Sequence, residues 1–485
     1  MFDLRPVGYV IGLLVAALGA AMLFPMLIDY AQGNGHWTAF FEAAVISVVV
    51  GGLMALACAN GVKQHLSIQQ TFLLTTGVWV ALPVFGAIPF LTGATGQEAV
   101  SFVDAMFEAM SGLTTTGSTV FSGLEDFPKG LLFWRALLQW FGGIGIIVVA
   151  MVFLPELRVG GMQIFRSEGF DTFGKILPRA TEIASRISVV YFTLTILCAF
   201  TYLGFGMAPF DATTHAMTTV ATGGFANYDS SFEVFSPGVE YAAVLFMLLA
   251  ALPFVRYVQL LAGSAKPLLH DSQIRVFFAT VFAIVLVMVI WQLNSFDTAT
   301  ETSFRKVLFN VVSILTGTGY SSEDYMAWGG FPVALFFFAG LIGGCAGSTS
   351  CSIKIFRYQL LFSSIKAQVG RIHSPHGLFS PRYGGRSVGD DVLSSVMAFF
   401  VLFVVSLGVI AILLALTGLD FITSVSGAAA ALANIGPGLG PIIGPAGNFS
   451  SLEDSAKWIL IAAMLIGRLE LMAVYVLFTL KFWRG

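Results

Sequence analysis

Long apolar segments alternate with short ones along this chain, and that alternation predicts its elements. A helix that crosses a membrane needs about 20 mainly apolar residues. Tyr9–Ile28 and Phe40–Ala59 meet this length and form an opening pair of predicted spans. From Thr71 onward a second pattern begins: a long span, an apolar segment too short to cross, a glycine-containing loop, and another long span.

This second pattern occurs four times. The first spans of the four copies are Thr71–Thr92, Ile187–Met207, Arg275–Leu293 and Val392–Thr417. The short re-entrant helices are Val103–Leu113, Ala212–Val220, Ser303–Leu315 and Ile422–Ala433. The second spans are Leu131–Phe153, Tyr241–Leu261, an over-long apolar stretch Phe331–Phe362, and Trp458–Phe482.

The fold class that follows is an all-α polytopic membrane protein with ten transmembrane spans. It consists of an N-terminal helix pair and four pseudo-repeated helix–pore loop–helix units around one pore. We place the helix pair at residues 1–66. The four repeats are placed at 67–155, 156–267, 268–385 and 386–485, the third with a broken inner helix.

The composition agrees with a membrane protein. Of the 485 residues, 57% are apolar and only 11% are charged, far less charge than a soluble chain of this length carries. No basic stripe is present, which argues against nucleic-acid binding. Arg5 precedes an apolar run without a small-residue cleavage site, so the start predicts an anchor rather than a signal peptide. The four cysteines form no CxxC pair and predict neither a metal site nor a disulfide.

The charged residues are distributed unevenly. Ten spans place both termini on one side, and with that side cytoplasmic most of the 24 Lys and Arg fall in inner loops or the tail. This is the distribution that the positive-inside rule expects. Most of the 27 Asp and Glu then fall on the outer side. Individually they are explained as solvating groups, but together they would concentrate cations at the outer mouth.

Glycine and threonine dominate the loops that follow the four short helices. With Gly117, Gly224, Gly319 and Gly436 set in register, no local gap is needed. Glycine permits unusual backbone dihedrals, so a loop can turn its carbonyl oxygens inward to replace the water around a cation. The C-terminal end of each short helix adds a partial negative charge. Any single loop is weak evidence, because small residues also pack helices, but four in register predict an ion filter.

Four stretches carry a resemblance to a known family: Thr114–Thr119, Ala221–Phe225, Thr316–Tyr320 and Asn434–Gly438. The chain resembles the Trk/Ktr/HKT superfamily of potassium transporters, in its bacterial TrkH-type branch, over its whole length. The resemblance implies one potassium-channel-like pore in each protomer of a homodimer. It also implies a cytosolic nucleotide-binding regulatory subunit of the TrkA type, the bacterial inner membrane, cytoplasmic termini, K⁺ as the transported ion and no covalently bound cofactor.

The resemblance also assigns the ion-binding residues of the selectivity filter. Gly117, Gly224, Gly319 and Gly436 match the family's filter glycines. The carbonyls expected beside them belong to Thr115, Thr116, Thr222, Gly223, Gly317, Thr318, Asn434 and Ile435. None of these loops has the TVGYG sequence of tetrameric potassium channels, so we expect weaker discrimination between potassium and sodium.

A gate is predicted where the apolar stretch Phe331–Phe362 is interrupted by glycines and hydroxyl residues. These are poor helix formers, so we predict a broken helix; a kink or a close-packing small-residue face is the alternative. The resembling family places a gating loop at this point, beneath the filter. The predicted gate residues are Gly343, Gly344, Cys345, Ala346, Gly347 and Ser348.

Arg468 is the second predicted gate element, deep within the last predicted span. A charge at that depth usually faces a cavity or a partner. We interpret Arg468 as a pore-facing residue that binds freed carbonyls near Cys345 and holds the gate shut, with a snorkelling or structurally paired arginine as the alternative. Glu470 is not expected to face it, because residues two apart lie on different sides of a helix.

Two other functional classes stay open beside gated potassium uptake. A sodium- or proton-coupled transporter of an organic solute also uses broken helices, but it predicts two related halves rather than four units. An intramembrane enzyme needs a nucleophile with its base, or metal ligands, and the spans contain no HExxH, GxSxG or Asp pair. The sequence leaves open whether transport is passive or proton-coupled, and which signal opens the gate.

Overall fold

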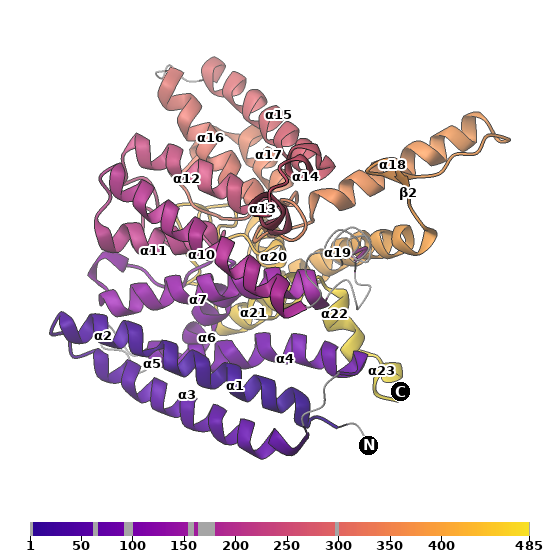
Figure 1. The fold of residues 1–485 in the computed structure, drawn as a ribbon. Helices are drawn as coiled ribbons and strands as arrows, with labels where there is room; N and C mark the ends of the chain where they lie inside the picture. The colour runs from indigo at the N-terminus through magenta and orange to yellow at the C-terminus, as the bar shows by residue number, and fades with distance from the viewer. Residues whose placement is uncertain are drawn as a thin grey trace.

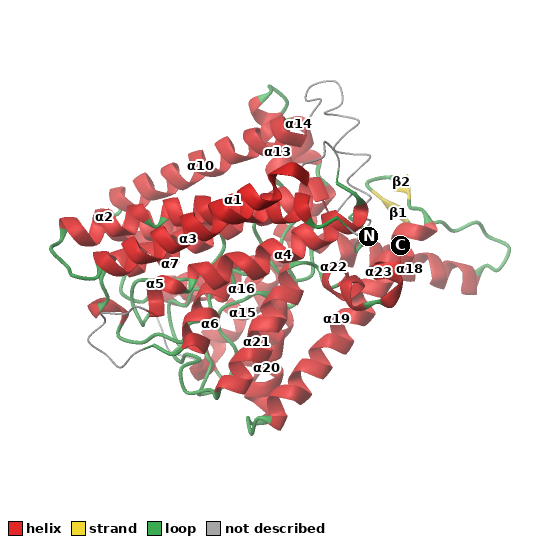
Figure 2. Ribbon diagram, turned by 90° about the horizontal axis from the view of Figure 1, so that it is seen from below, coloured by secondary structure: helices red, strands yellow, loops and turns green. Residues whose placement is uncertain are grey.

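The computed structural model describes residues 3–61, 66–91, 100–153, 160–162, 180–295 and 300–484. Almost all of its regular structure is helical, as Figure 2 shows, and this confirms the predicted all-α fold. Within these residues, the strands are β1 (Arg382–Tyr383) and β2 (Arg386–Ser387), which have two residues each and pair as an antiparallel hairpin. The repeat boundaries given above stay predictions.

The N-terminal pair packs through small residues. α1 (Arg5–Ala21) continues into α2 (Leu23–Ala31), and α3 (Trp37–Cys58) returns beside them. A Cβ atom on Gly12 would lie 2.7 Å from the Gly51 oxygen, and one on Gly51 would lie 2.6 Å from the Gly12 oxygen. Glycine at both positions therefore lets the two backbones touch, a common way to pack helices in lipid.

Each repeat has a long first helix, a short helix and a second helix, and Figure 1 shows repeat 4 returning to lie beside repeat 1. The first helices are α4 (Ile68–Gly86, followed by α5, Ile88–Leu91), α10 (Ala180–Gly204), α15 (Ser272–Ser295) and α19 (Asp390–Leu416). The short helices are α6 (Phe102–Leu113), α11 (Pro209–Val220), α16 (Thr300–Thr316) and α20 (Phe421–Ala433). The second helices begin with α7 (Lys129–Val148), α12 (Pro237–Ala250), α17 (Gly330–Gly340) and α21 (Asp454–Arg468).

The predicted short helices agree with the observed ones to within a few residues, but two predicted continuous spans are wrong. α12 meets α13 (Phe254–Leu261) at an angle of 88°. Pro253 lies at this break and has no N–H to continue the helix. α21 meets the helical segment Met472–Phe478, which begins with α22 (Met472–Tyr475), at 106°. Glu470 and Leu471 at that break have left-handed dihedrals, with φ of 59° and 55°.

The third repeat is broken as predicted, but it extends further than the apolar pattern does. α17 ends at Gly340, and α18 (Ile355–His373) begins after a non-helical segment and continues well past Phe362. Figure 1 shows α18 projecting from the body on the side that carries both termini. Two short helices remain: α14 (Lys266–His270) lies between α13 and α15 in the chain, and α23 (Leu480–Arg484) follows the helical segment that ends at Phe478.

The count of ten spans is not reproduced by helix length alone. Within the described residues, seven helices are long and apolar enough to cross a membrane, or up to nine if each bent pair counts as one span. The spanning windows of α10, α15 and α19 are 33%, 28% and 33% buried, whereas that of α7 is 67% buried. The first helices of repeats 2 to 4 therefore form the apolar outside, and the short helices lie in the core.

Candidate functional site

The four short helices end in the same backbone geometry. Each is followed by a left-handed residue: Thr115 (φ 52°), Thr222 (50°), Gly317 (77°) and Asn434 (52°). The next N–H in each loop turns back to bond a carbonyl of the last helical turn. These bonds are Thr116 to Ser111 (2.9 Å), Gly223 to Thr218 (2.8 Å), Thr318 to Ser313 (2.9 Å) and Ile435 to Ala430 (2.8 Å). This is a Schellman-type helix end, and it leaves other carbonyls of each end directed along the helix axis.

The glycines that follow these helix ends meet one another, and we call Gly117, Gly224, Gly319 and Gly436 the glycine ring. A Cβ on Gly117 would overlap the Gly223 oxygen of repeat 2, and one on Gly224 would overlap the Thr318 oxygen of repeat 3. A Cβ on Gly319 would lie 2.7 Å from the Gly436 nitrogen, and one on Gly436 would lie 3.1 Å from the Gly117 oxygen. Each repeat therefore contacts the next one at its glycine, and repeat 4 contacts repeat 1, so that the four contacts form a closed ring.

All twelve predicted filter residues lie in or beside this ring, but their carbonyls are not equivalent. The Gly223 oxygen accepts a hydrogen bond of 2.6 Å from Nε2 of Gln139. The Gly436 oxygen accepts one of 2.7 Å from the Ser118 hydroxyl. These two carbonyls already have protein donors, which the loop sequences do not reveal.

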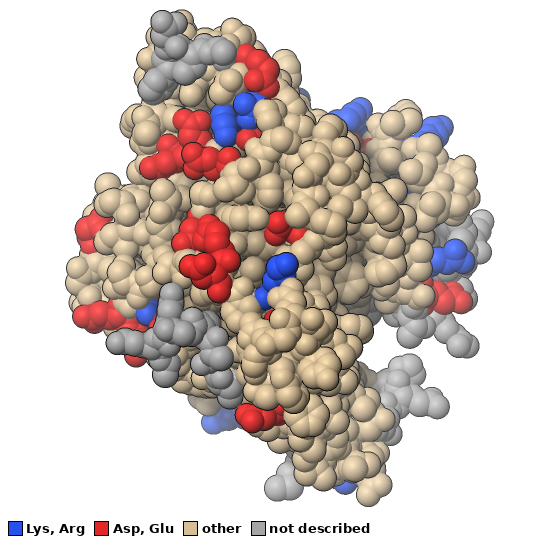
Figure 3. All heavy atoms as spheres, turned by 90° about the vertical axis from the view of Figure 1, so that its left-hand side faces the viewer, with Lys and Arg blue, Asp and Glu red and all other residues tan. Residues whose placement is uncertain are grey.

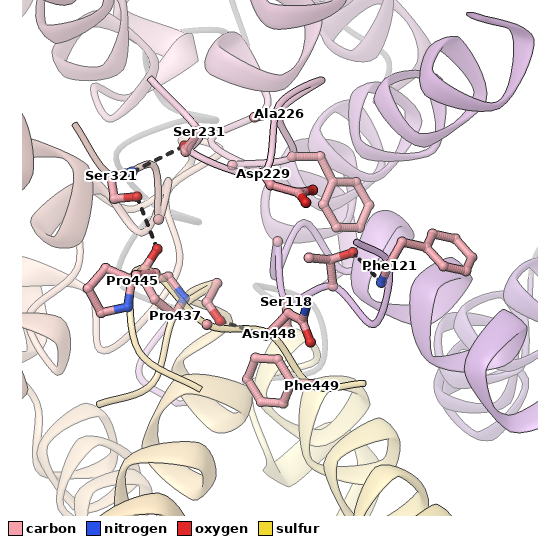
Figure 4. A pocket seen from close by; sticks show the side chains of 18 of the residues that line it. Ser118, Phe121, Ala226, Asp229, Ser231, Ser321, Pro437, Pro445, Asn448 and Phe449 are labelled. Atoms are coloured by element: carbon pink, nitrogen blue, oxygen red, sulfur yellow. Dashed lines mark hydrogen bonds between the residues drawn. The ribbon is translucent and has the colours of Figure 1, made fainter. Parts of the chain in front are cut away.

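A cavity of about 150 Å³, which we call the outer cavity, opens on one side of the ring. All four ring glycines line it, and so do polar residues of every repeat: Ser118, Asp229, Ser321 and Asn448, which Figure 4 shows around the opening. Figure 3 shows acidic side chains gathered on the face opposite the termini. The cavity is therefore polar and directed toward the acidic side of the molecule.

Tyr228 at this cavity is held as a neutral phenol. Its hydroxyl donates a hydrogen bond of 3.0 Å to Asp211. Burial raises the pKa of Tyr228 to about 12, and the hydrogen bond and charge of Asp211 add to the rise. Asp211 is not the N-cap of α11 but lies in its first turn, and its carboxylate accepts a hydrogen bond from Asn227 in the loop beyond the ring. Asp104 likewise lies inside α6, whose N-cap is Ser101.

The predicted gate residues lie on the opposite side of the ring, packed against the break between α12 and α13. The Cys345 N–H donates to the Ala251 oxygen (3.0 Å), and the Phe254 N–H donates to the Gly347 oxygen (2.9 Å). The Ala346 N–H donates to the Gln273 side chain (2.9 Å). We call the segment from Leu341 to Lys354 the intramembrane loop. Its part nearest the ring is Cys351, whose sulfur lies 3.6 Å from the Thr115 hydroxyl.

Arg468 contacts this loop, but at a different point from the predicted one. Its Nη1 donates to the Cys351 sulfur (2.8 Å) and its Nη2 to the Gly142 oxygen of α7 (3.4 Å). The predicted contact with carbonyls near Cys345 is therefore wrong. Arg468 lies at the end of α21, at the break, and borders a cavity of about 30 Å³ together with Cys351 and Asn434.

Several buried polar residues at the site were missed from the sequence. Glu470 forms an ion pair with Arg357 of α18, which helical spacing could not indicate because the helix ends before Glu470. Arg135 of α7 pairs with Glu108 of α6 at 2.7 Å, behind the ring. Arg135 falls inside the predicted span Leu131–Phe153, so the argument that selected Arg468 would also have found it.

Four re-entrant helices whose ends and glycine loops meet at one centre, surrounded by apolar spanning helices, define a multi-pass membrane protein of the pore-forming class. The family model for TrkH, described as a cation transport protein, matches residues 36–484. The chain belongs to this family.

Curated relatives and a solved structure are similar over the whole length. The Trk system potassium uptake protein TrkI of Halomonas elongata is 41% identical over 481 residues, covering 99% of this chain and 97% of that protein. TrkH of Escherichia coli K12 is 35% identical over 486 residues, covering 99% of both. The crystal structure of the potassium transporter TrkH from Vibrio parahaemolyticus superimposes with a TM-score of 0.91 at 33% identity, covering 100% of both chains.

Proposed function

We propose that this chain is a potassium-uptake subunit that passes K⁺ through the glycine ring. The observation that carries the proposal is the closed series of backbone contacts between Gly117, Gly224, Gly319 and Gly436. Four helix ends with negative partial charge and four ring glycines without a Cβ atom suit a dehydrated cation. The printed names of the relatives, potassium uptake proteins, support K⁺ as the cargo.

The ion-binding residues are those of the four loops. We assign the binding of K⁺ to carbonyls of Thr115, Thr116, Gly117, Thr222, Gly224, Gly317, Thr318, Gly319, Asn434 and Ile435. Gly223 and Gly436 contribute to the wall of the ring, since their carbonyls already accept hydrogen bonds. The proposal needs no cofactor and no catalytic residue.

The gate is proposed to be the intramembrane loop. Gly343, Gly344, Cys345, Ala346, Gly347 and Ser348 form its base against α12 and α13, and Cys351 reaches the underside of the ring. Arg468 connects the loop to α7 and places a positive charge below the ring. Displacement of the loop toward the side of the termini would open the path.

Further parts of the proposal concern location and partners. The side that carries both termini and α18 is taken as cytoplasmic, with the protein in the bacterial inner membrane. A TrkA-type nucleotide-binding subunit would dock on this side, in keeping with relatives named as parts of a Trk system. The homodimer would use α18, whose exposed apolar side chains form one stripe.

One observation favours the second candidate, a coupled transporter of an organic solute. The second helices of repeats 2 and 4 both break, at 88° and 106°, and paired breaks are typical of such transporters. The four-loop ring has no role in that mechanism, so potassium uptake is the preferred function.

The test is ion flux into liposomes that contain the purified protein, with Na⁺, Rb⁺ and an amino-acid mixture as competitors. We expect K⁺ and Rb⁺ to enter and to compete with each other. Gly→Ser changes at the ring glycines should raise Na⁺ flux relative to K⁺ flux. Uptake of an amino acid without any alkali-cation flux, also after addition of a cytosolic nucleotide-binding partner, would contradict the pore.

A further inference from the structure

A second set of hydrogen bonds fixes the glycine loops on the side of the outer cavity. The residue three positions after each ring glycine donates its backbone N–H to a side chain of the preceding short helix. Val120 donates to Glu108 (3.1 Å), Asn227 to Nε2 of His215 (3.3 Å), Ser322 to Asn310 (3.2 Å) and Leu439 to the Ser426 hydroxyl (2.9 Å). We call Glu108, His215, Asn310 and Ser426 the anchor residues.

The anchor residues occupy equivalent places in the four repeats although their chemistry differs. Glu108, His215 and Asn310 stand at the same distance before their ring glycines, and Ser426 stands one residue further away. A carboxylate, an imidazole, an amide and a hydroxyl share one property, an atom that accepts a hydrogen bond from N–H. All four side chains are buried, with exposures between 0% and 4%.

Each anchor residue is itself held in one orientation. Glu108 also accepts a bond from Arg135 (2.7 Å), and Asn310 donates to the Lys306 oxygen (2.9 Å). The Ser426 hydroxyl donates back to the Leu439 oxygen (3.2 Å). His215 uses Nε2 as an acceptor, so the ring is neutral with its hydrogen on Nδ1, directed to the Asp211 oxygen at 2.8 Å.

Every loop is therefore fixed at both ends. The Schellman-type bond fixes the residue before the ring glycine, and the anchor residue fixes the third residue after it. Between these two points lie the ring glycine and the two residues that follow it. The spacing of oxygens around a cation changes its affinity strongly, and a site held loosely loses discrimination.

We propose that the anchor residues Glu108, His215, Asn310 and Ser426 are positioning residues that set the width of the glycine ring and so its preference among monovalent cations. This inference rests on the proposed function, because it requires the ring to be the cation path. A merely structural role would lower stability in their variants but leave the ratio of K⁺ to Na⁺ flux unchanged.

The experiment compares K⁺ and Na⁺ flux, under equal gradients, in liposomes of the unmodified full-length protein and of four variants. Asn310→Leu keeps the side-chain volume but removes the acceptor of the Ser322 N–H. Ser426→Ala removes the hydroxyl with almost no change of shape. Ser426→Thr retains the hydroxyl that accepts from the Leu439 N–H and donates to the Leu439 oxygen. Asn294→Leu is the matched control, because Asn294 is exposed at the end of α15 and bonds only within its helix among the contacts described.

We expect the ratio of K⁺ to Na⁺ flux to fall about three- to tenfold in Asn310→Leu and Ser426→Ala, the net effect of losing the hydrogen bonds of one buried side chain. The ratio should stay near that of the unmodified protein in Ser426→Thr and Asn294→Leu. An unchanged ratio in Ser426→Ala overturns the inference, whatever the stability of Asn310→Leu. Absence of alkali-cation flux in the unmodified protein, with the cytosolic partner present, overturns the proposed function instead.

Discussion

At the scale of single residues, a buried ion pair stands out behind the glycine ring. Arg135 donates to Glu108 (2.7 Å) and to the Ala226 oxygen (2.8 Å), and its guanidinium lies 4.2 Å from the centre of the Phe225 ring. One side chain thus joins α6, α7 and the loop after α11. Removing one member of such a pair leaves an uncompensated buried charge, which is strongly destabilising.

Glu108→Gln should therefore lower the free energy of unfolding by about 3 kcal/mol, although Gln still accepts the Val120 N–H. Cation flux should also fall, because Arg135 lines the outer cavity and would repel cations there. Denaturation in detergent and K⁺ flux check both effects. Glu301→Gln is the control, since that carboxylate is 58% exposed beside Arg305 and its loss should cost less than about 1 kcal/mol. Equal destabilisation in the two variants would contradict the argument.

The four ring glycines differ in how much they tolerate a side chain. Gly224 has a φ of 80°, and its Cβ would overlap the Thr318 oxygen. Gly436 is not among the residues with positive φ, and the nearest atom to its Cβ would be 3.1 Å away. We expect Gly224→Ala to reduce K⁺ flux at least about tenfold, from a left-handed strain of about 1–2 kcal/mol plus the overlap. Gly436→Ala should retain most of the flux; a reversed order, at equal expression, would show that the ring contacts do not limit permeation.

At the scale of elements, the broken helices satisfy one another's backbone groups. Breaks at Ala251–Pro253 and at the intramembrane loop face each other, and the Thr349 hydroxyl adds a bond of 3.1 Å to the Ala250 oxygen. Irregular backbone at membrane depth is stable only where such partners or water are present. The two breaks therefore depend on each other. The break in repeat 3 was predicted from its over-long, interrupted apolar stretch, whereas the predicted span Tyr241–Leu261 gave no sign of the break after α12.

Arg468→Ala is predicted to raise ion flux. The substitution removes the links to Cys351 and Gly142 and the positive charge beneath the ring, so the intramembrane loop becomes easier to displace. We expect a severalfold increase of K⁺ flux in liposomes without the regulatory partner. Arg371→Ala, at the exposed end of α18, is the control and should leave flux unchanged. Unchanged or lower flux with normal expression of Arg468→Ala would count against the gate.

At the scale of the whole molecule, ion pairs join neighbouring units on the side of the outer cavity. Lys457 of repeat 4 bonds Asp104 of repeat 1 (2.6 Å), and Arg305 of repeat 3 bonds Glu240 of repeat 2 (2.7 Å). Asp29 attaches the N-terminal pair to repeat 1 through the Gly130 N–H (2.7 Å). On the opposite side α18 stands away from the body, as Figure 1 shows.

The projecting helix leads to a prediction about assembly. Phe362, Ile365, Val369 and Ile372 recur at helical spacing and are 65%, 49%, 59% and 73% exposed. If two copies of the chain bury this stripe, Ile365→Ser with Val369→Ser should weaken the dimer by about 3 kcal/mol, or roughly a hundredfold. Light scattering of the detergent-solubilised protein measures the effect. Lys366→Ser with Gln368→Ser, on the same helix, is the control; a dimer retained in both doubles would place the interface elsewhere.

The register of the four loops was sufficient to predict which segments meet, because helix–loop–helix periodicity and glycine placement are local properties. In the same register, Glu108, His215 and Asn310 stand at the same distance before their ring glycines. Because a carboxylate, an imidazole and an amide differ in chemistry, the alignment did not show that all three accept a backbone N–H of the loop. Cys351, Gln139 and the pair of Arg357 with Glu470 could not be predicted, since each depends on a partner far away in the chain.

The amino-acid sequence by itself determined that this is an all-α membrane protein with four re-entrant helices, because hydrophobic length and glycine position act within each segment. The tertiary structure alone decided where α12 and α21 break, which carbonyls already have donors, and which side chains fix the glycine loops. These features arise from contacts between repeats, and the energy of a buried hydrogen bond depends on the atom that chain folding brings to it.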